Sequence, residues 1–314
     1  MGFDRSLDRE CICGYDRLKK QVLDSISVAW GGSVIPVSAD RAAITQVTIP
    51  DGVTEVYQGA FSGFSALTTV TATDSVKLIT DGSFSGLTTL TSVSFPGVEK
   101  LSGGAFAGCS NFQASTATAF PKLKVLIDGS LSGCSSLSYI QGVYSRSGIT
   151  DFSLPELEYI DGSATGSGVG YRTINCPKLR EVGYGCFKGQ LYGVILENED
   201  GTRNDLYLPE CVKIGESNFH WLRCGRIILP KIEEIGKDSF NSSEFTACIM
   251  SNPTKVCKLT AGVGSNFVDT MNYKDDDHYW FYVPKALIDQ YKTEWGETLA
   301  ERFRAIEDYP DICE

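Results

Sequence analysis

The sequence has few of the residues on which enzyme active sites and metal centres most often depend. Its 314 residues include only two histidines, His220 and His278, and three methionines. No nucleophile-elbow motif or comparable signature accompanies His220, which argues against a triad built on serine or cysteine. No apolar run approaches the ~20 residues that a membrane-spanning helix needs. We therefore expect neither catalysis of this type nor insertion into a membrane.

Positive charge is also in short supply. The sequence has 28 lysines and arginines against 39 aspartates and glutamates, a formal net charge of −11. Nucleic acids and anionic membranes are therefore poor partners, and the acidity is expected to keep an extended scaffold soluble. Residues 1–30 carry too many charges for a secretory signal peptide, although processing would have removed one.

Three short segments resemble ligand-binding motifs without meeting their spacing. Asp275-Asp-Asp-His278 offers four consecutive potential ligands, but consecutive side chains of an extended chain point apart and the spacing of a calcium loop is missing. Cys11-Ile-Cys13 lacks the two-residue gap and the histidine partners of a zinc site. The glycines of Gly166–Gly170 are followed by no Lys-Ser/Thr pair, as a phosphate-binding loop requires. We predict no metal, no cofactor and no catalytic residue.

A repeated pattern dominates the middle of the chain. An aliphatic residue, a second one three positions later, a small residue and then an aromatic residue or leucine recur seven times, and we call this last residue the anchor. Successive anchors are separated by 23, 22, 25, 56, 32 and 21 residues, and a period near 23 is typical of a solenoid. The anchors are Phe61, Phe84, Phe106, Leu131, Phe187, Phe219 and Phe240.

Each repeat is predicted to form one coil with short extended segments and one helical turn. Alternating stretches such as Val70–Ala72 and Val93–Phe95 indicate strands with one buried face. Apolar residues at the anchor and three and six residues beyond it indicate the helical turn. About nine coils, at ~4.8 Å per coil, would share one core with the phenylalanine anchors in a column.

Prolines and glycines are expected to separate these segments. The prolines that should end the strands are Pro50, Pro96, Pro121, Pro177, Pro209 and Pro230. The glycines suited to corners with positive φ are Gly59, Gly82, Gly103, Gly183, Gly215 and Gly236.

These repeats resemble the BspA-type leucine-rich repeats. The family's coil follows roughly L-x-x-I-x-I-P-x-x-V-x-x-I-G-x-x-A-F-x-x-C-x-x-L, and Ile44–Leu67 matches it at nearly every marked position. Lys213–Phe219 and Glu234–Phe240 carry its I-G-x-x-x-F core. The resemblance covers about residues 44–284 and implies a leucine-rich repeat solenoid, a strand-rich α/β fold with short helical turns. Family members are largely bacterial and protist surface proteins that bind host matrix or other cells, which implies an extracellular or cell-surface location and a role in cell adhesion.

Two departures interrupt the regular spacing. One degenerate coil, Leu154–Gly170, has Ala164 where the anchor belongs. Before the Phe219 coil, Glu197–Thr202 is inserted as a predicted hairpin tip. Both departures argue against uniform curvature.

The two ends of the chain are predicted to cap the stack. Leu18, Val22 and Ile26 recur at helical spacing and predict a helical N-terminal cap. At the other end a strand at Tyr279–Val283 is followed by Pro284 opening a helix. A second turn and helix are predicted through Leu299, Phe303 and Ile306. The chain then divides into an N-terminal helical cap, the repeats and a C-terminal strand-helix cap at residues 1–43, 44–270 and 271–314.

Most of the eleven cysteines fall on interior positions of the repeat, where they are expected to act as small buried apolar residues. Cys109 and Cys134 match the cysteine of the family pattern. Their equivalent places on successive coils, with Cα atoms ~5 Å apart, are also compatible with a disulfide.

The remaining candidates are surfaces. The exposed positions of the early strands are threonines and serines, which are common on strands for reasons of packing alone. Later coils carry tyrosines instead, and aromatic side chains are enriched at recognition hot spots and also stack on sugars. The candidate binding residues are Tyr139, Tyr144, Tyr159 and Tyr171.

Together these features predict a non-enzymatic binding or adhesion module that presents a solenoid surface to a protein or glycan partner. A first alternative is a structural or host-recognition component of a phage tail or cell-surface assembly, docked through the N-terminal helix. A second alternative, a β-helical polysaccharide-processing enzyme, would need a catalytic cluster on consecutive coils, and the sequence offers none.

Overall fold

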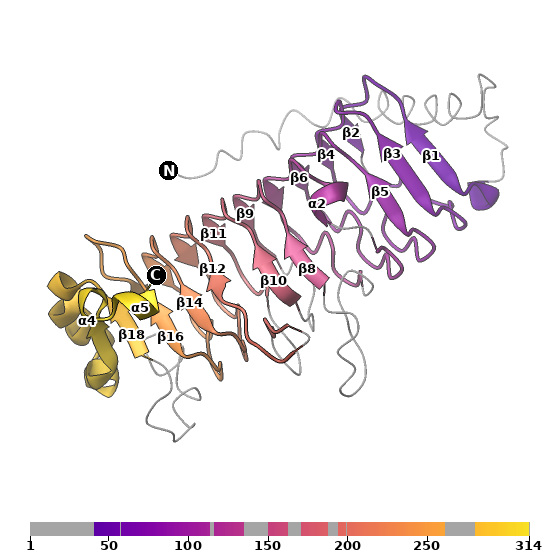
Figure 1. Ribbon diagram of the computed structural model, residues 1–314. Helices are drawn as coiled ribbons and strands as arrows, with labels where there is room; N and C mark the ends of the chain where they lie inside the picture. Colours follow the sequence, from indigo (N-terminus) through magenta and orange to yellow (C-terminus); the bar gives the residue numbers. More distant parts are fainter. Residues whose placement is uncertain are drawn as a thin grey trace.

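The protein forms an elongated solenoid of parallel coils, seen in a computed structural model (Figure 1). The residues described are 41–56, 58–113, 116–134, 150–162, 171–187, 194–198, 200–260 and 280–313. The predicted N-terminal helix and the segment Asp275–His278 lie outside them. Of the expected N-terminal cap, only a 3-10 turn, η3 (Arg41–Ala43), is described.

One long side of the solenoid is a nine-stranded sheet, which we call the spine sheet. Each coil contributes one two-residue strand, and neighbouring strands pair in parallel and in register. Its nine strands confirm the predicted number of coils. In chain order they are β2 (Glu55–Val56), β4 (Leu78–Ile79), β6 (Lys100–Leu101), β7 (Val125–Leu126), β9 (Tyr159–Ile160), β11 (Glu181–Val182), β13 (Lys213–Ile214), β15 (Glu234–Ile235) and β17 (Lys258–Leu259).

A second side, which faces the viewer in Figure 1, consists of three separate parallel sheets. The first sheet confirms the strands predicted from alternating residues, and a short helix, α2 (Thr116–Ala119), follows it. The sheets are β1 (Gln46–Ile49), β3 (Thr69–Ala72) and β5 (Ser92–Ser94); β8 (Thr150–Ser153) and β10 (Tyr171–Asn175); and β12 (Leu206–Tyr207), β14 (Arg226–Ile228), β16 (Ala247–Ile249), β18 (Trp280–Val283) and β19 (Phe303–Ala305).

The prolines lie where they were expected. Pro50 directly follows β1, Pro96 lies two residues beyond β5, and Pro177 lies two residues beyond β10. Because proline has no backbone N–H to donate, it ends pairing on the front side and lets the chain turn toward the spine sheet. Pro121 differs, since it follows α2 instead of a strand.

The core is one continuous hydrophobic cluster that runs through all nine coils. The rings of Phe84 and Phe106 are stacked with centroids 4.7 Å apart. Phe187 and Phe219 are stacked at 5.0 Å, and Phe219 stacks on Phe240 at 5.5 Å. The predicted column is therefore present in one core, as two stacks of anchor rings separated by the coil with the leucine anchor and the degenerate coil.

The predicted helical turn after each anchor is not a helix in the described coils. Phe84 donates its backbone N–H to Ala105 of the next coil at 2.8 Å, and Phe106 donates to Ser130 at 2.8 Å. Leu87 instead bonds back to Phe84 in a tight turn, at 3.3 Å. Leu90 likewise bonds back to Leu87 at 3.1 Å, so the segment is a series of tight turns and a continuous i to i−4 ladder does not form.

Only half of the predicted corner glycines have positive φ. Gly59, Gly82 and Gly103 do, with φ of 69°, 63° and 58°. The other three, Gly183, Gly215 and Gly236, have no room for a side chain. The Asp161 side chain fills the space at Gly183, and the backbone of the preceding coil fills it at Gly215 and Gly236. A Cβ on Gly215 would lie 2.7 Å from the carbonyl oxygen of Gly183, and one on Gly236 would lie 2.5 Å from the carbonyl carbon of Gly215.

Both departures from the regular spacing are accommodated locally. The degenerate coil still contributes β9 to the spine sheet, between β7 and β11, so the stack is not broken there. The predicted hairpin is present, because Glu197 and Arg203 form an antiparallel bridge and Asn198 donates to Thr202 at 2.8 Å. It lies close to the next coil, since a Cβ on Gly225 would come within 3.1 Å of the carbonyl oxygen of Arg203.

The C-terminal segment begins as predicted. The strand β18 leads to Pro284, then to the 3-10 turn η5 (Lys285–Leu287) and to α4 (Ile288–Trp295). Trp295 donates its indole N–H to the carbonyl oxygen of Cys257 at 2.8 Å, which ties α4 to the last coil. The prediction of a helix through Phe303 was wrong: η6 (Glu297–Arg302) gives way there to the strand β19. Phe303 pairs with Phe281 of β18 and packs on its ring at 5.6 Å.

The last residues fold back over the front side. They comprise η7 (Ile306–Asp308) and α5 (Pro310–Cys313). This tail covers a second, small cluster on the outer face of the sheet, built on Ile249 and Tyr282. Arg226 of β14 holds the tail by donating to the carbonyl oxygen of Ile312 at 2.6 Å.

Replacing Phe106 by alanine should lower the free energy of unfolding by about 3–5 kcal/mol, because it leaves a cavity between stacked neighbours. Chemical denaturation measures the change. Tyr184→Ala is the control, since that ring is 55% exposed and its loss should cost less than about 0.5 kcal/mol. A midpoint unchanged in the Phe106 variant would contradict the shared core.

Gly215→Ala should destabilise the protein by about 1–3 kcal/mol, because its methyl group would overlap the backbone of the preceding coil. Gly86→Asn provides the comparison. Its Cβ meets no atom within 4 Å, and asparagine tolerates the left-handed backbone that Gly86 adopts at φ 74°. Equal thermal midpoints for the two variants would show that the backbones are not closely packed at Gly215.

Candidate binding surfaces

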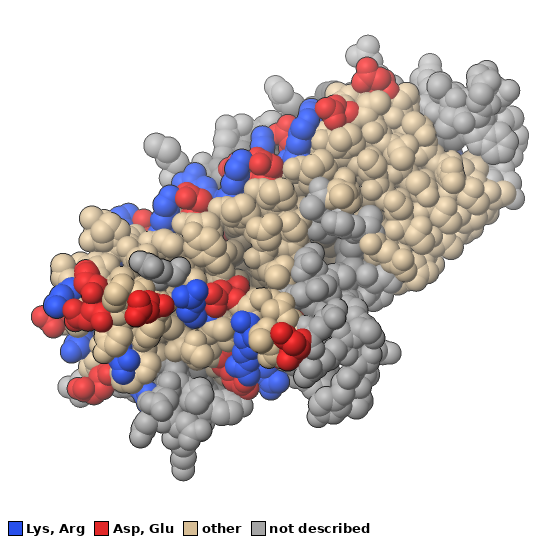
Figure 2. Space-filling model, viewed as in Figure 1, with Lys and Arg blue, Asp and Glu red and all other residues tan. Residues whose placement is uncertain are grey.

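The outer face of β1, β3 and β5 carries no charged side chain. We call it the hydroxyl face, and it consists of Gln46, Thr48, Thr69, Thr71, Ser92 and Ser94. Parallel pairing places equivalent residues side by side, so hydroxyl groups repeat from strand to strand at about 4.8 Å. In Figure 2 this part of the front side has no acidic or basic atoms, whereas the region over β12 and β14 has both.

Some threonine hydroxyls of these coils serve the scaffold. Thr68 and Thr91 each donate to a carbonyl oxygen of the preceding coil, at 2.9 and 3.0 Å. On the hydroxyl face itself, Thr48 and Thr71 hydrogen-bond each other at 3.1 Å. The outward side chains of β5, Ser92 and Ser94, are exposed. The face therefore combines fixed hydroxyl groups with short side chains that lose little entropy when a partner binds.

Charged residues gather instead along the spine side, where opposite charges alternate from coil to coil (Figure 2). Glu99 lies between Lys77 and Lys124, at 3.8 and 2.9 Å. The hydrogen bond from Lys124 lowers the pKa of Glu99. Further pairs join Lys122 to Asp74, Lys178 to Glu156, Lys213 to Glu234, Lys231 to Glu210 and Lys255 to Glu233.

Each such pair is exposed and contributes at most about 1 kcal/mol. Their main effect is to prevent repulsion between stacked coils. Equivalent residues of stacked coils lie side by side, so a row of one charge would repel along its whole length, and alternating signs remove that repulsion. Most of the charged side chains described on this side therefore form ion pairs with other residues of the protein.

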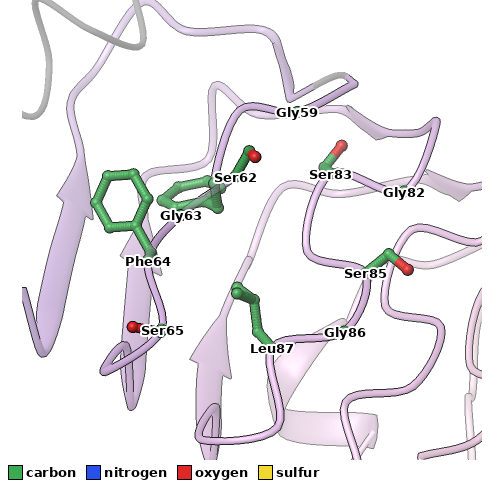
Figure 3. A pocket seen from close by; sticks show the side chains of 11 residues that line it. Gly59, Ser62, Gly63, Phe64, Ser65, Gly82, Ser83, Ser85, Gly86 and Leu87 are labelled. Carbon is green, nitrogen blue, oxygen red and sulfur yellow. The ribbon is translucent and has the colours of Figure 1, made fainter. Parts of the chain in front are cut away.

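A shallow groove lies between the first two turns that follow the anchors (Figure 3). Its volume is about 370 Å³, and it is bounded by the turns 59–65 and 82–87. It is open because Gly59, Gly63 and Gly86 have no side chains, and a Cβ on any of them would meet no atom within 4 Å. Serines and glycines line it together with Phe61, Phe64 and Leu87, and none of the lining residues is charged. This mixed lining suits an uncharged group.

Of the four predicted tyrosines, the two that the structure describes lie on different sheets. Tyr139 and Tyr144 lie outside the described residues. Tyr159 is in β9 of the spine sheet, whereas Tyr171 is in β10 on the front side. Tyr159 is half-buried and donates its hydroxyl to Asp161 at 2.9 Å, and burial together with this bond raises its pKa. This bond fixes the orientation of its ring, and a role of Tyr159 and Tyr171 in binding stays a prediction.

Three other aromatic residues are more exposed than Tyr159. Tyr184 is 55% exposed, Tyr207 52% and Trp221 36%. The sequence contained a signal for Trp221. It stands two residues after its anchor, where the early coils have glycine, as at Gly63 and Gly86. His220 packs against Trp221 with ring centroids 4.8 Å apart.

The cysteines are free thiols wherever the structure describes them. Cys109 donates its thiol to the carbonyl oxygen of Phe84 at 3.0 Å, and Cys134 donates to Phe106 at 3.1 Å. The disulfide that their spacing allowed is thus not formed, and each thiol bonds to the preceding coil. Among the described residues, no three His, Cys, Asp or Glu side chains are grouped as a metal site.

Comparison with known families identifies the repeats. Residues 39–153 match the BspA type leucine rich repeat region, in six copies. These residues are BspA-type leucine-rich repeats, the family predicted from the sequence, and the spine sheet continues in the same register through β17. The sequence matches none of the curated proteins.

Three solved structures show a distant likeness. A leucine-rich repeat protein from Bacteroides ovatus ATCC 8483 is 15% identical over 85% of each chain, with a TM-score of 0.27. A leucine rich cell surface protein from Faecalibacterium prausnitzii A2-165 is 18% identical over 72% of this chain and 77% of the other, at 0.18. The pneumococcal vaccine antigen PcpA is 14% identical over 83% and 77%, at 0.25. Likenesses at these TM-scores carry no argument about function.

No helix in the described part of the chain has both the length and the apolar character to cross a membrane.

The buried thiols should make the protein sensitive to alkali. Burial raises the pKa of Cys109 to about 11 and those of Cys176 and Cys211 to about 12, from 9.0. Unfolded thiols ionise near pH 9 while folded ones stay neutral. The stabilisation is therefore complete below pH 9 and is lost as pH rises toward 11 and 12. The thermal midpoint should fall between pH 8.5 and 10.5.

Thiol labelling provides the independent check. In a variant with Cys11 and Cys13 replaced by serine, only Cys313, which is partly exposed, should react quickly with an aromatic disulfide at pH 8. The eight buried thiols should react only after unfolding in denaturant. Rapid reaction of several thiols in the native protein would rule out their close packing.

Proposed function

We propose that this protein is a non-enzymatic binding module that presents the hydroxyl face to a protein or glycan partner. The observation that carries the proposal is the contrast between the two long sides of the early coils. Charges on the spine side pair with one another, whereas the hydroxyl face is uncharged in a chain with a net charge of −11. An uncharged face avoids the desolvation cost that buried charges would impose on a partner.

The scaffold supports this role. Parallel pairing holds β1, β3 and β5 in one register, so the face is arranged before a partner arrives, which reduces the entropy lost on binding. The groove between the first two turns adds a second uncharged surface on the same coils. A location outside the cell or on its surface, and adhesion as the task, follow from the family resemblance.

We also propose that the chain is organised as an N-terminal cap, repeats and a C-terminal cap at residues 1–43, 44–270 and 271–314. The tie between Trp295 and Cys257 supports the C-terminal part, because α4 there covers core residues of the last coil. A covered end is what an open stack requires, since a bare end would expose core and unpaired strands.

The purified full-length chain should be screened against a glycan array and a panel of matrix proteins. The double variant Ser92→Lys/Ser94→Lys places two charges on exposed positions of β5 and should weaken binding at least about tenfold, or 1.4 kcal/mol. Lys178→Ser/Lys231→Ser alters the spine side and should leave binding within about twofold. Both variants should retain the wild-type thermal midpoint.

Equal binding by the wild type and the β5 variant would remove the hydroxyl face as the binding surface. Release of shorter saccharides from arrayed glycans, measured by mass spectrometry, would instead support a polysaccharide-processing enzyme. Absence of any ligand in both screens would contradict the adhesion role.

A further inference from the structure

Trp221 occupies a backbone conformation that bulky residues rarely adopt. Its φ is 58°, in the left-handed region, where the early coils have glycine at the same place after the anchor. A large side chain is strained there and persists only where the surroundings hold it, and such residues gather at functional sites. The indole is also 36% exposed, so burial in the core does not account for its presence.

The surroundings hold this turn from both sides. Trp221 donates its backbone N–H to Asn241 of the next coil at 2.9 Å, and Leu222 donates to the Ser243 hydroxyl at 3.1 Å. Arg223 donates to Val194 of the preceding coil at 2.8 Å. The exposed indole therefore stands on a backbone that is fixed by two neighbouring coils.

A charged cluster follows the indole closely in the chain. Arg223 is two residues beyond Trp221, so their Cα atoms are at most about 7 Å apart, and both side chains are exposed. Arg223 pairs with Glu244 of the next coil, Nε to Oε1, at 3.3 Å. Arg203 reaches over from the hairpin and holds the other oxygen of Glu244 at 2.7 Å.

The side chains of this cluster are held in place by ion pairs but remain partly exposed to solvent. The side chain of Arg223 is 49% exposed and that of Arg203 37%. The hairpin carrying Arg203 is fixed by reciprocal side-chain bonds between Asn198 and Asn204, at 3.1 and 3.0 Å. An aromatic plane thus stands next to oriented donors and an acceptor, outside the hydroxyl face.

We propose that Trp221 and the Arg203–Arg223–Glu244 cluster form a carbohydrate-binding site for one or two sugar rings. The apolar face of a pyranose would stack on the indole, while Arg223 donates to ring hydroxyls and Glu244 accepts from them. This inference rests on the proposed binding function and names the ligand class and a second site for it. One exposed aromatic plane with polar groups close by in the chain matches the size and the mixed apolar and hydroxyl character of a sugar ring.

The test uses the full-length protein and soluble hexasaccharides of glucose, galactose, mannose, N-acetylglucosamine and galacturonic acid, with binding measured by titration calorimetry. At least one of them should bind. Trp221→Gly should weaken that binding at least tenfold and keep or raise the thermal midpoint, because glycine is the residue that earlier coils use in this conformation. Arg223→Ala should weaken it at least threefold.

Ser242→Gly is the matched control. Ser242 occupies the equivalent place on the next coil with φ of 56°, so its replacement removes the same backbone strain without removing a ring, and binding should stay within twofold of wild type. Wild-type affinity in Trp221→Gly, or no binding of any of the five sugars at millimolar concentration, would overturn the proposal.

The two binding proposals fail separately. A partner that binds through the hydroxyl face while no sugar binds would leave the proposed function intact and end this inference. Sugar binding that is lost in Trp221→Gly but unchanged in Ser92→Lys/Ser94→Lys would support this site and show that it acts independently of the hydroxyl face.

Discussion

Backbone hydrogen bonding between successive coils is the constraint on which the rest of the structure depends. Lys77, Glu99 and Lys124 each donate their N–H to the coil before, and the first three anchors donate theirs to the coil after. Each coil therefore has to copy the path of its neighbours, whatever its own sequence prefers. This is why the degenerate coil still supplies β9 and why a hairpin insertion leaves the spine sheet unbroken.

The same close approach decides which side chains the interior accepts. Where backbones nearly touch, as at Gly215 and Gly236, no side chain fits at all. Small thiols such as those of Cys109 and Cys134 fit while bonding to the preceding coil. Aromatic rings stack on one another at the anchors, and further buried rings such as Phe95 and Phe112 pack against that column. Packing restricts the outward-facing side chains much less. Uncharged hydroxyl groups, paired charges and a strained tryptophan therefore occur at different places on the surface.

The repeat made much of the fold predictable from the sequence. A pattern present in seven copies remains recognisable even where one copy departs from it. The strands β3, β5 and β18, the prolines at strand ends and the single core all followed from it. The helical turns after the anchors were mispredicted, since a period of three is shared by a helix and by successive tight turns. Phe303 was assigned to a helix for the same reason, although pairing with Phe281 places it in a strand.

The sequence by itself determined the repeat, the family, the number of coils and the residues that face inward, because burial in a stack imposes the same choice at every equivalent position. Tertiary structure alone decided which outward residues share a face. Tyr159 and Tyr171 are twelve residues apart, yet a turn of the coil sends them to different sheets. Arg203 and Glu244 are far apart in the chain, yet they meet because the hairpin folds across a glycine. Exposed positions carry no periodic signal of their own, so their grouping depends on the path of the chain through space.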